Sequence, residues 1–407
     1  MRRSIPLKRL VEPGRPITYG IVQAGEDVVD GVRYIRPVDM DGHRGVNPSS
    51  LRTTSPEIAA AYARSALKPG DVVVSIGPSF GKTMVVPAEL DGANLTQGTA
   101  RVAVRLDVEA QYIVWALQAQ TSVDFWETSI GGATFRALNI GPLAGTPIPM
   151  PERDEQRAIA DYLDRETARI DALIEEQQRL IGMLRERRAA VLSTALAPRD
   201  SWLRRRIKYI GHTQLGKMLD GGRAARMGDE LKSYVRAADV RADGSVNLVD
   251  LKQMPFSTAE LEVFDLRAGD VLLIEGGATV GRPGFMFQSA PGVAFQKTVN
   301  RLRVGPTADA RFVYWSMLRL YESNYYANHY GAVSFVHLTG EKLREIELDL
   351  PSIDEQRRIA AYLDEQTAKI DALIAETERF VELSRERRSA LITAAVTGQI
   401  DVSDEVA

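Results

Sequence analysis

The chain has no cysteine among its 407 residues, and this absence excludes several kinds of site. Disulfides, thiolate metal ligands and cysteine nucleophiles all need a thiol, so none of them can operate here. The four histidines are scattered and lack the spacing of a zinc-binding pair. We therefore expect no metal site in this chain. The absence of thiols also fits a cytoplasmic protein.

Long apolar runs and a strong charge bias are also missing. No segment approaches the ~20 apolar residues of a membrane helix. The basic start MRRSIPLKRL is not followed by the apolar core of a secretory signal. The net charge of −3 predicts no nucleic-acid footprint for the chain as a whole. The net charge of each segment differs, however. It is slightly positive for the two long segments, 1–151 and 197–351, and negative for 152–196, 352–396 and the tail.

The sequence contains no complete phosphate-binding loop and no evident catalytic pair. A Walker A loop has four residues between its glycines, followed by Lys-Ser/Thr. The segment GPSFGKT at 77–83 has only three, and GGATVGRP at 276–283 has Arg282-Pro283 in place of Lys-Ser/Thr. No nucleophile lies in an evident pair with a base. We therefore expect a chain without catalytic residues.

What the sequence does contain is a repeat. The segment DEQRAIADYLD at 154–164 returns as DEQRRIAAYLD at 354–364, and 151–196 matches 351–396 at 25 of 46 positions. The preceding segments match more loosely. LKPGDVVVSIG at 67–77 corresponds to LRAGDVLLIEG at 266–276, and QGT at 97–99 is aligned with QKT at 296–298. A period near 200 residues is too long for a solenoid and predicts two copies of one domain followed by one helix.

Both repeated segments are proline-free after their first residue and carry apolar residues at the a/d spacing of a coiled coil. Helices of ~43 residues are ~65 Å long, which favours packing on each other over packing on their own domains. A pseudo-two-fold relation makes the two helices antiparallel. Asp154 and Asp354 are expected to be the N-caps. The expected seam and partner-binding residues are Asp154, Gln156, Arg157, Ile159, Leu163, Ile170, Leu173, Asp354, Gln356, Arg357, Ile359, Leu363, Ile370 and Leu373.

The two long segments are predicted to be mixed α/β domains. Short β-branched runs such as DVVVSI and DVLLIE indicate strands, and AQYIVWALQAQ and ARFVYWSMLRL indicate helices. The fold class is therefore α+β, with two mixed domains separated by a long antiparallel two-helix coiled coil. The expected boundaries are 1–151 for domain one, 152–197 for the central helix, 198–351 for domain two, 352–397 for the C-terminal helix and 398–407 for an acidic tail.

Each domain also offers a similar set of polar residues near glycine-rich turns. Arginine, lysine and glutamine read base edges in DNA, and glycine loops allow the backbone to approach phosphates. For any single residue, a turn or a solvated cation is the simpler interpretation, and the duplication is the stronger signal. The candidates for DNA binding are Arg33, Tyr34, Arg36, His43, Arg44, Lys82, Thr83, Gln97, Tyr234, Arg236, Arg282, Gln296, Lys297, His329 and Tyr330.

These features resemble one family. The two helical motifs, each followed by RERR, and the preceding LKPGD and LRAGD segments are similar to the DNA specificity subunit of type I restriction–modification enzymes. The resemblance covers nearly the whole chain. It implies a non-catalytic subunit with two target-recognition domains.

The resemblance also implies partners. Double-stranded DNA, two modification (methyltransferase) subunits and possibly two restriction (translocase and nuclease) subunits are expected, with no membrane. S-adenosylmethionine, ATP and magnesium are expected on those partners and no cofactor on this chain. Because the two domains differ in sequence, their half-sites should differ, so the target should be asymmetric and bipartite. The alternative is a coiled-coil adaptor that binds protein partners without reading DNA sequence.

Overall fold

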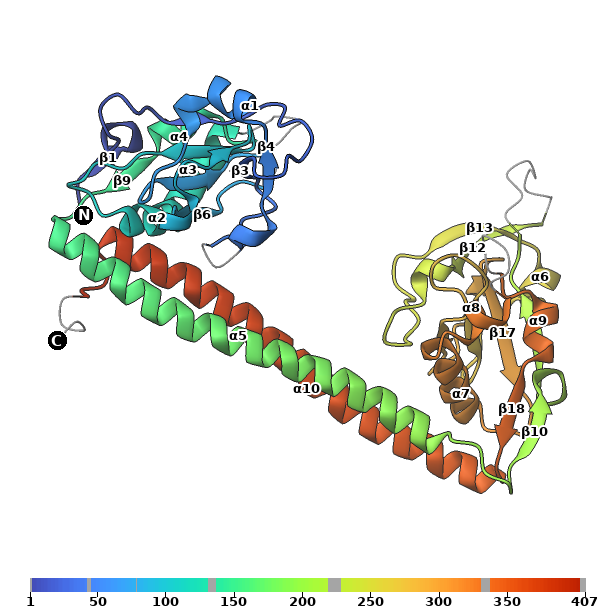
Figure 1. Ribbon diagram of the computed structural model, residues 1–407. Coiled ribbons are helices and arrows are strands. Elements are labelled where there is room, and N and C mark those ends of the chain that lie inside the picture. Colours follow the sequence, from blue (N-terminus) through green and yellow to red (C-terminus); the bar gives the residue numbers. More distant parts are fainter. Residues whose placement is uncertain are drawn as a thin grey trace. The chain divides into compact units, whose positions relative to one another are not determined.

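The computed structural model describes residues 2–41, 45–77, 79–130, 137–218, 228–330 and 337–402 (Figure 1). Contacts divide the chain into two units, one comprising Met1–Gln178 with Glu378–Ala407 and the other Arg179–Thr377. Each unit contains one mixed α/β domain and parts of two long helices, α5 (Arg153–Ala195) and α10 (Ile353–Thr397). The α+β class and the long helices are confirmed.

The described residues of the first domain form three small sheets. The four-stranded antiparallel sheet has the order β2 (Thr18–Tyr19), β8 (Thr99–Val102), β5 (Val72–Ser75), β6 (Thr83–Val85). The three-stranded sheet has the order β4 (Arg52–Thr54), β3 (Val32–Ile35), β7 (Asn94–Leu95), and β1 (Ser4–Pro6) pairs with β9 (Pro147–Pro149). The helices are η1 (Leu7–Arg9), η2 (Pro48–Ser50), α1 (Pro56–Ala61), η3 (Ala63–Ser65), η4 (Ala88–Leu90), α2 (Ala110–Gln118), α3 (Gln120–Ile130) and α4 (Ile140–Gly145).

The second domain repeats this arrangement strand for strand. Its sheets have the orders β11 (Gly211–Leu215), β17 (Val299–Val304), β14 (Val271–Ile274), β15 (Pro283–Phe285), then β13 (Lys252–Phe256), β12 (Glu230–Val235), β16 (Ala294–Phe295), and β10 (Leu203–Arg206) with β18 (Glu347–Leu350). Its helices are η5 (Ile207–Tyr209), η6 (Ala237–Asp239), α6 (Thr258–Val263), α7 (Ala310–Glu322), α8 (Tyr325–Tyr330) and α9 (Gly340–Glu345). The duplication read from the sequence is therefore a duplication of fold.

Each domain core continues into the long helices. In the first unit, α2 buries Tyr112 and Trp115 completely, in one cluster with Ile159 and Leu163 of α5 and Ile392 of α10. The β-branched strand β5 is buried along its whole length because both of its faces are covered. In the second unit, α7 packs in the same way into a cluster that includes residues of both helices. The helix ends are thus parts of the domains.

Within each unit, α5 and α10 run antiparallel. In the first unit, Asp171 and Arg388 form an ion pair at 2.8 Å, and Arg2 links Glu155 near the start of α5 to the carbonyl oxygen of Ala395 near the end of α10. In the second unit the same pair recurs as Arg188 and Asp371, at 3.0 Å. The two pairs are equivalent, because Asp371 is the repeat counterpart of Asp171 and Arg188 is that of Arg388. The antiparallel pairing predicted from the repeat is therefore present inside each unit.

The helix seam differs from the predicted one. Leu173 and Leu373, expected in the seam, are 38 % and 50 % exposed, whereas the following Ile174 is 8 % exposed. The seam also includes Thr167, which is completely buried. Its hydroxyl donates to the carbonyl oxygen of Leu163 at 2.5 Å, and a threonine with its hydroxyl satisfied in this way fits an apolar seam. The seam residues beyond Leu163 and Leu363 are Thr167, Ile170, Ile174, Ile181, Leu184, Thr367, Ile370, Thr377, Val381 and Ser384.

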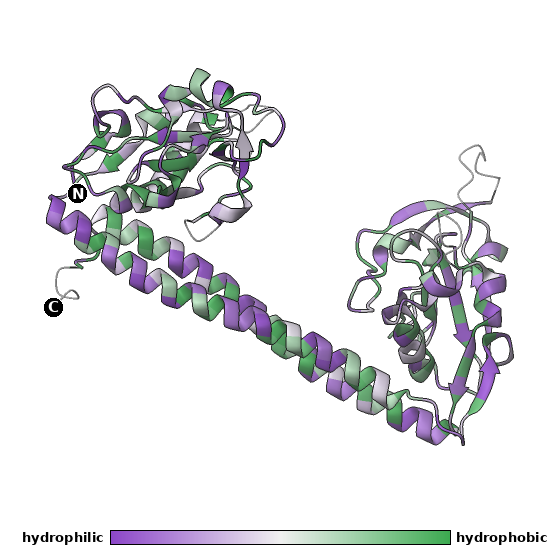
Figure 2. Cartoon of the chain, viewed as in Figure 1, coloured by the Kyte–Doolittle hydropathy of each residue, from purple (hydrophilic) through white to green (hydrophobic). Residues whose placement is uncertain are grey.

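The predicted N-caps are also corrected. Helices α5 and α10 begin at Arg153 and Ile353, so Asp154 and Asp354 lie within the first turn. There they complement the positive end of the helix dipole without capping it. Both helices alternate hydrophilic and hydrophobic residues along their length (Figure 2). Among the helices of the described residues, none is long and apolar enough to span a membrane.

Candidate nucleic-acid and partner interfaces

Four of the cations predicted to bind DNA are engaged in holding a loop. Arg36 donates two hydrogen bonds to the carboxylate of Asp39, at 2.9 and 2.7 Å, and Arg236 binds Asp239 in the same way. Lys82 Nζ donates to the carbonyl oxygen of Met40 at 2.6 Å. These bonds hold the loop in shape. Arginine has five N–H donors and lysine three, so contacts of these residues with phosphate stay predictions.

The cation of the second copy repeats this role. Arg282 donates to the carbonyl oxygen of Val240 at 2.7 Å, the counterpart of the Lys82–Met40 contact 200 residues earlier. The cation is a lysine in the first domain and an arginine in the second, but it bonds to the carbonyl oxygen at the same position of the fold in both. This conservation within the chain indicates that the loop after β3 and the loop after η6 need a fixed shape in both domains.

Other candidates are buried. Tyr34 and Tyr234 are each 4 % exposed, in strands β3 and β12. Thr83 is 2 % exposed and accepts a hydrogen bond from Gln118, and Gln296 is 7 % exposed. Such side chains cannot reach a base without a change of the fold, so these four are corrected from DNA contacts to parts of the core.

The remaining described candidates lie at the surface. Arg33, Gln97, Lys297 and His329 are exposed, and His329 stacks on Tyr325 with ring centres 3.9 Å apart. These four residues stay as predicted DNA contacts. His43 and Arg44 lie outside the described residues.

Tyr330 is an intermediate case. It is half-buried under Lys342, whose Nζ lies 5.0 Å from the ring centre, and burial raises the pKa of Tyr330 to about 12. Its hydroxyl is therefore protonated at neutral pH and remains a hydrogen-bond donor. Tyr330 also stays a predicted contact.

The backbone ladder corrects the alignment of the two copies at this surface. The amide of Gln97 donates to the carbonyl oxygen of Ile21, and the amide of Lys297 donates to that of Lys217, both at 2.9 Å. Gln97 is therefore equivalent to Lys297, not to Gln296 as the sequence alignment had it. At the same exposed position, one domain presents a neutral amide and the other a cation.

The repeated glutamine of the DEQR motif anchors each helix to its domain. Gln156 is 2 % exposed, accepts from the amide of Glu109 at 3.0 Å and donates to the carbonyl oxygen of Pro151 at 2.9 Å. Gln356 makes the same two bonds with Asp309 and Pro351, at 2.8 and 2.9 Å. Both were expected to bind a partner. The structure corrects this, because their amides are used internally.

A second anchor was missed in the sequence. Asp164 accepts a hydrogen bond from the indole of Trp115 at 3.0 Å, and Asp364 accepts one from Trp315 at 2.9 Å. Both tryptophans are at most 2 % exposed, and a buried indole N–H needs an acceptor. The signal was available, since an identical YLD triplet and a tryptophan recur in both copies at matching positions.

The exposed side of the helices carries a duplicated apolar stripe. In the heptad, Ile174 occupies seam position a and Thr377 occupies seam position d. Leu173 and Leu373 are therefore g positions, which lie beside the seam. The stripe adjoins the seam on one flank of each helix. Its members, all more than a third exposed, are Leu173, Leu180, Met183, Leu373, Phe380 and Leu383.

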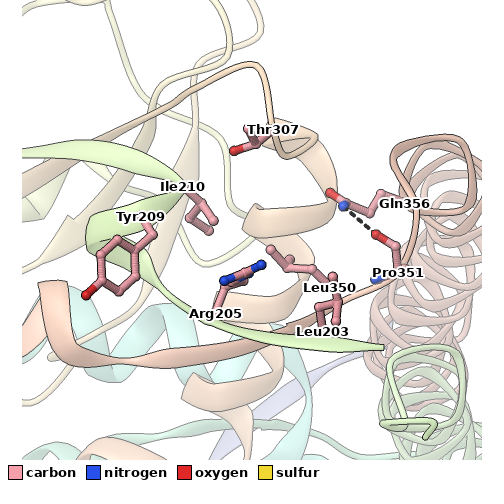
Figure 3. Close-up of a pocket in the computed structure, with 8 residues that line it drawn as sticks. All are labelled: Leu203, Arg205, Tyr209, Ile210, Thr307, Leu350, Pro351 and Gln356. Carbon is pink, nitrogen blue, oxygen red and sulfur yellow. Dashed lines mark hydrogen bonds between the residues drawn. The ribbon is translucent and has the colours of Figure 1, made fainter. Parts of the chain in front are cut away.

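A pocket occurs at the junction of helix and domain in each unit. In the second unit it has a volume of about 390 Å³, and Figure 3 shows Arg205 and Leu203 of β10 beside Leu350 and close to the bonded pair Pro351–Gln356. Its counterpart in the first unit, of about 550 Å³, is lined by the equivalent residues of β1, η1 and α5. The two domains have diverged, yet both keep this pocket.

Comparison with known proteins supports the family resemblance over part of the chain. Residues 202–381 match the family described as the type I restriction modification DNA specificity domain. The type I restriction enzyme EcoBI specificity subunit of Escherichia coli is 25 % identical over 191 residues, which are 46 % of this chain and 40 % of that protein. The match thus spans less than half of the curated relative.

Two solved structures share this fold over nearly the whole chain. The HsdS subunit of Thermoanaerobacter tengcongensis aligns over 98 % of this chain and 97 % of its own, with 18 % identity and a TM-score of 0.57. A chain from a structure on complex assembly and conformational transition of the type I R-M system covers 98 % of both chains, with 17 % identity and a TM-score of 0.70. The resemblance seen in the repeated helices is confirmed: residues 202–381 match the family described as the type I restriction modification DNA specificity domain, and both solved structures share the fold over nearly the whole chain.

Proposed function

We propose that this chain is the DNA-reading subunit of a type I restriction–modification complex, in which each domain reads one half of an asymmetric bipartite target. The observation that carries the proposal is duplication with divergence. The two domains share a strand order and a helix anchor, yet present Gln97 and Lys297 at the same exposed position. A glutamine amide suits adenine and a lysine ammonium suits guanine, so equivalent loops would prefer different bases.

The same proposal gives the chain no reaction of its own. Methyl transfer belongs to partner subunits that hold S-adenosylmethionine, and any cleavage belongs to restriction subunits that use ATP and magnesium. The helices would set the distance between the two half-sites and hold two modification subunits. An exposed apolar stripe that recurs on both helices supports docking of two copies of one partner, because large exposed apolar patches mark protein interfaces.

The test is methylation mapping. The chain is expressed with an adenine methyltransferase subunit of a type I system in a host that lacks other adenine methylation. We expect methylated adenines at one bipartite sequence with two different halves. Methylation without sequence preference would favour the coiled-coil adaptor, and no methylation despite a stable complex would refute DNA reading by this chain.

A stripe variant tests partner docking separately. Replacing Met183 and Leu383, which are 59 % and 52 % exposed, with glutamate leaves the seam intact. We expect unchanged unfolding but at least about tenfold weaker binding of the methyltransferase, because a charge would be buried in an apolar contact. Gln178→Glu adds a charge on the opposite flank and serves as the control. Equal binding by all three proteins would place the partner elsewhere.

A further inference from the structure

A buried arginine is duplicated in the two domains, with different surroundings. Arg101 of β8 lies opposite Val73 in the sheet register, and Arg301 of β17 lies opposite Leu272, so the two arginines are structural equivalents. They are 3 % and 4 % exposed. A cation buried to this degree needs compensation, usually by a carboxylate.

The second domain supplies that carboxylate. Arg301 donates to the Asp265 carboxylate at 3.0 Å and to the Asp265 carbonyl oxygen at 2.6 Å. The residue at this place in the first domain is Ala66, whose carbonyl oxygen accepts from Arg101 at 3.2 Å. Arg101 also reaches the carbonyl oxygen of Pro16, also at 3.2 Å. Within the described part of the chain, no carboxylate bonds to Arg101, and burial lowers the pKa of its guanidinium.

A pocket of about 650 Å³ opens beside Arg101. The other cations that line it are Arg15, Arg64 and Lys68, and the lining includes the carboxylate of Asp91. Arg15 binds two further carboxylates, Asp71 at 2.6 Å and Glu12 at 3.0 Å. Four cations and three carboxylates leave one positive charge in excess, and the buried Nε of Arg101 has no hydrogen-bond partner among the described residues.

We propose that this pocket of the first domain binds a phosphate-type anion, which takes the place that the Asp265 carboxylate occupies in the second domain. Guanidinium and ammonium groups bind phosphate oxygens through short charge-assisted hydrogen bonds. Two sources share this chemistry, a backbone phosphate of DNA and free inorganic phosphate. Phosphate binding itself does not depend on the proposed function, whereas the DNA source does.

The full chain is titrated with inorganic phosphate by calorimetry, in a chloride background of constant ionic strength. We expect one saturable site in the native protein and at least about tenfold weaker binding in Ala66→Asp, which installs the carboxylate of the second domain. Arg64→Gln with Lys68→Gln should weaken binding as well and avoids any change at the buried residue. Absence of a phosphate-specific signal in the native chain, or unchanged affinity in both variants, would overturn the proposal.

The source is then separated with DNA. If the anion is a backbone phosphate, Ala66→Asp should weaken binding of a target duplex and reduce the salt slope by about one ion. If duplex binding is unaffected while phosphate binding is lost, the ligand is free phosphate. A failure of the methylation experiment would leave the calorimetric result standing, so the two proposals fail separately.

Discussion

Replacing Gln156 with alanine is expected to destabilise the first unit by about 2 kcal/mol, because the amide of Glu109 and the carbonyl oxygen of Pro151 both lose their partner. The glutamine is 2 % exposed and lines the adjoining pocket. The free energy of unfolding is measured with a chemical denaturant. Hydrogen exchange at the Glu109 amide should accelerate in the same variant, which ties the loss to this bond.

The neighbouring residue provides the control. The side chain of Arg157 is 77 % exposed and lies 4.0 Å from Asp161, so Arg157→Ala should change stability by less than about 0.5 kcal/mol. Gln356→Ala should destabilise the second unit as Gln156→Ala does the first. Similar effects of the glutamine and arginine variants would show that the buried anchor contributes little.

Lengthening both helices by one heptad is expected to widen the gap between the two half-sites of the target by about three base pairs. Seven residues of helix add about 10 Å, and one base pair takes about 3.4 Å. The insertions are placed after Gln178 and after Phe380, and each repeats the preceding heptad. A whole heptad returns the seam to phase, so the pairing of α5 and α10 is preserved.

Methylation mapping measures this gap, as in the test of the proposed function. The bases within each half-site should not change, since no residue of either domain is altered. An insertion of four residues in each helix is the control, because it rotates the seam out of phase and should destabilise the protein. A gap of unchanged length with the seven-residue insertions would contradict the idea that the helices set the spacing.

The seam shows where reading the sequence succeeded and where it failed. Apolar residues at three- and four-residue steps predicted the two helices, and Ile159, Leu163 and Ile370 are buried as expected or nearly so. Leu173 was wrongly placed in the seam, because Leu173 and Ile174 lie three and four residues after Ile170 and both steps fit the a/d spacing. In the structure, Ile174 is 8 % exposed and lies in the seam, whereas Leu173 is 38 % exposed.

The candidate DNA contacts show a different limit. Residue type alone could not separate Lys82, which is bonded to the Met40 carbonyl oxygen, from exposed Lys297. The partner of Lys82 lies 42 residues away, and that of Gln156 lies 47 residues away. No local pattern records such pairs.

By itself, the sequence determined the duplication, the two long helices and the mixed character of the domains, because identity at a fixed offset and hydrophobic period are local properties of the chain. Only the tertiary structure decided which repeated residues serve the fold and which remain at the surface. Gln156 and Asp164 anchor a helix to its domain through hydrogen bonds, whereas Leu173 and Lys297 are exposed. The physical reason is that burial and hydrogen-bond pairing join residues far apart in sequence, and they exist only once the chain is folded.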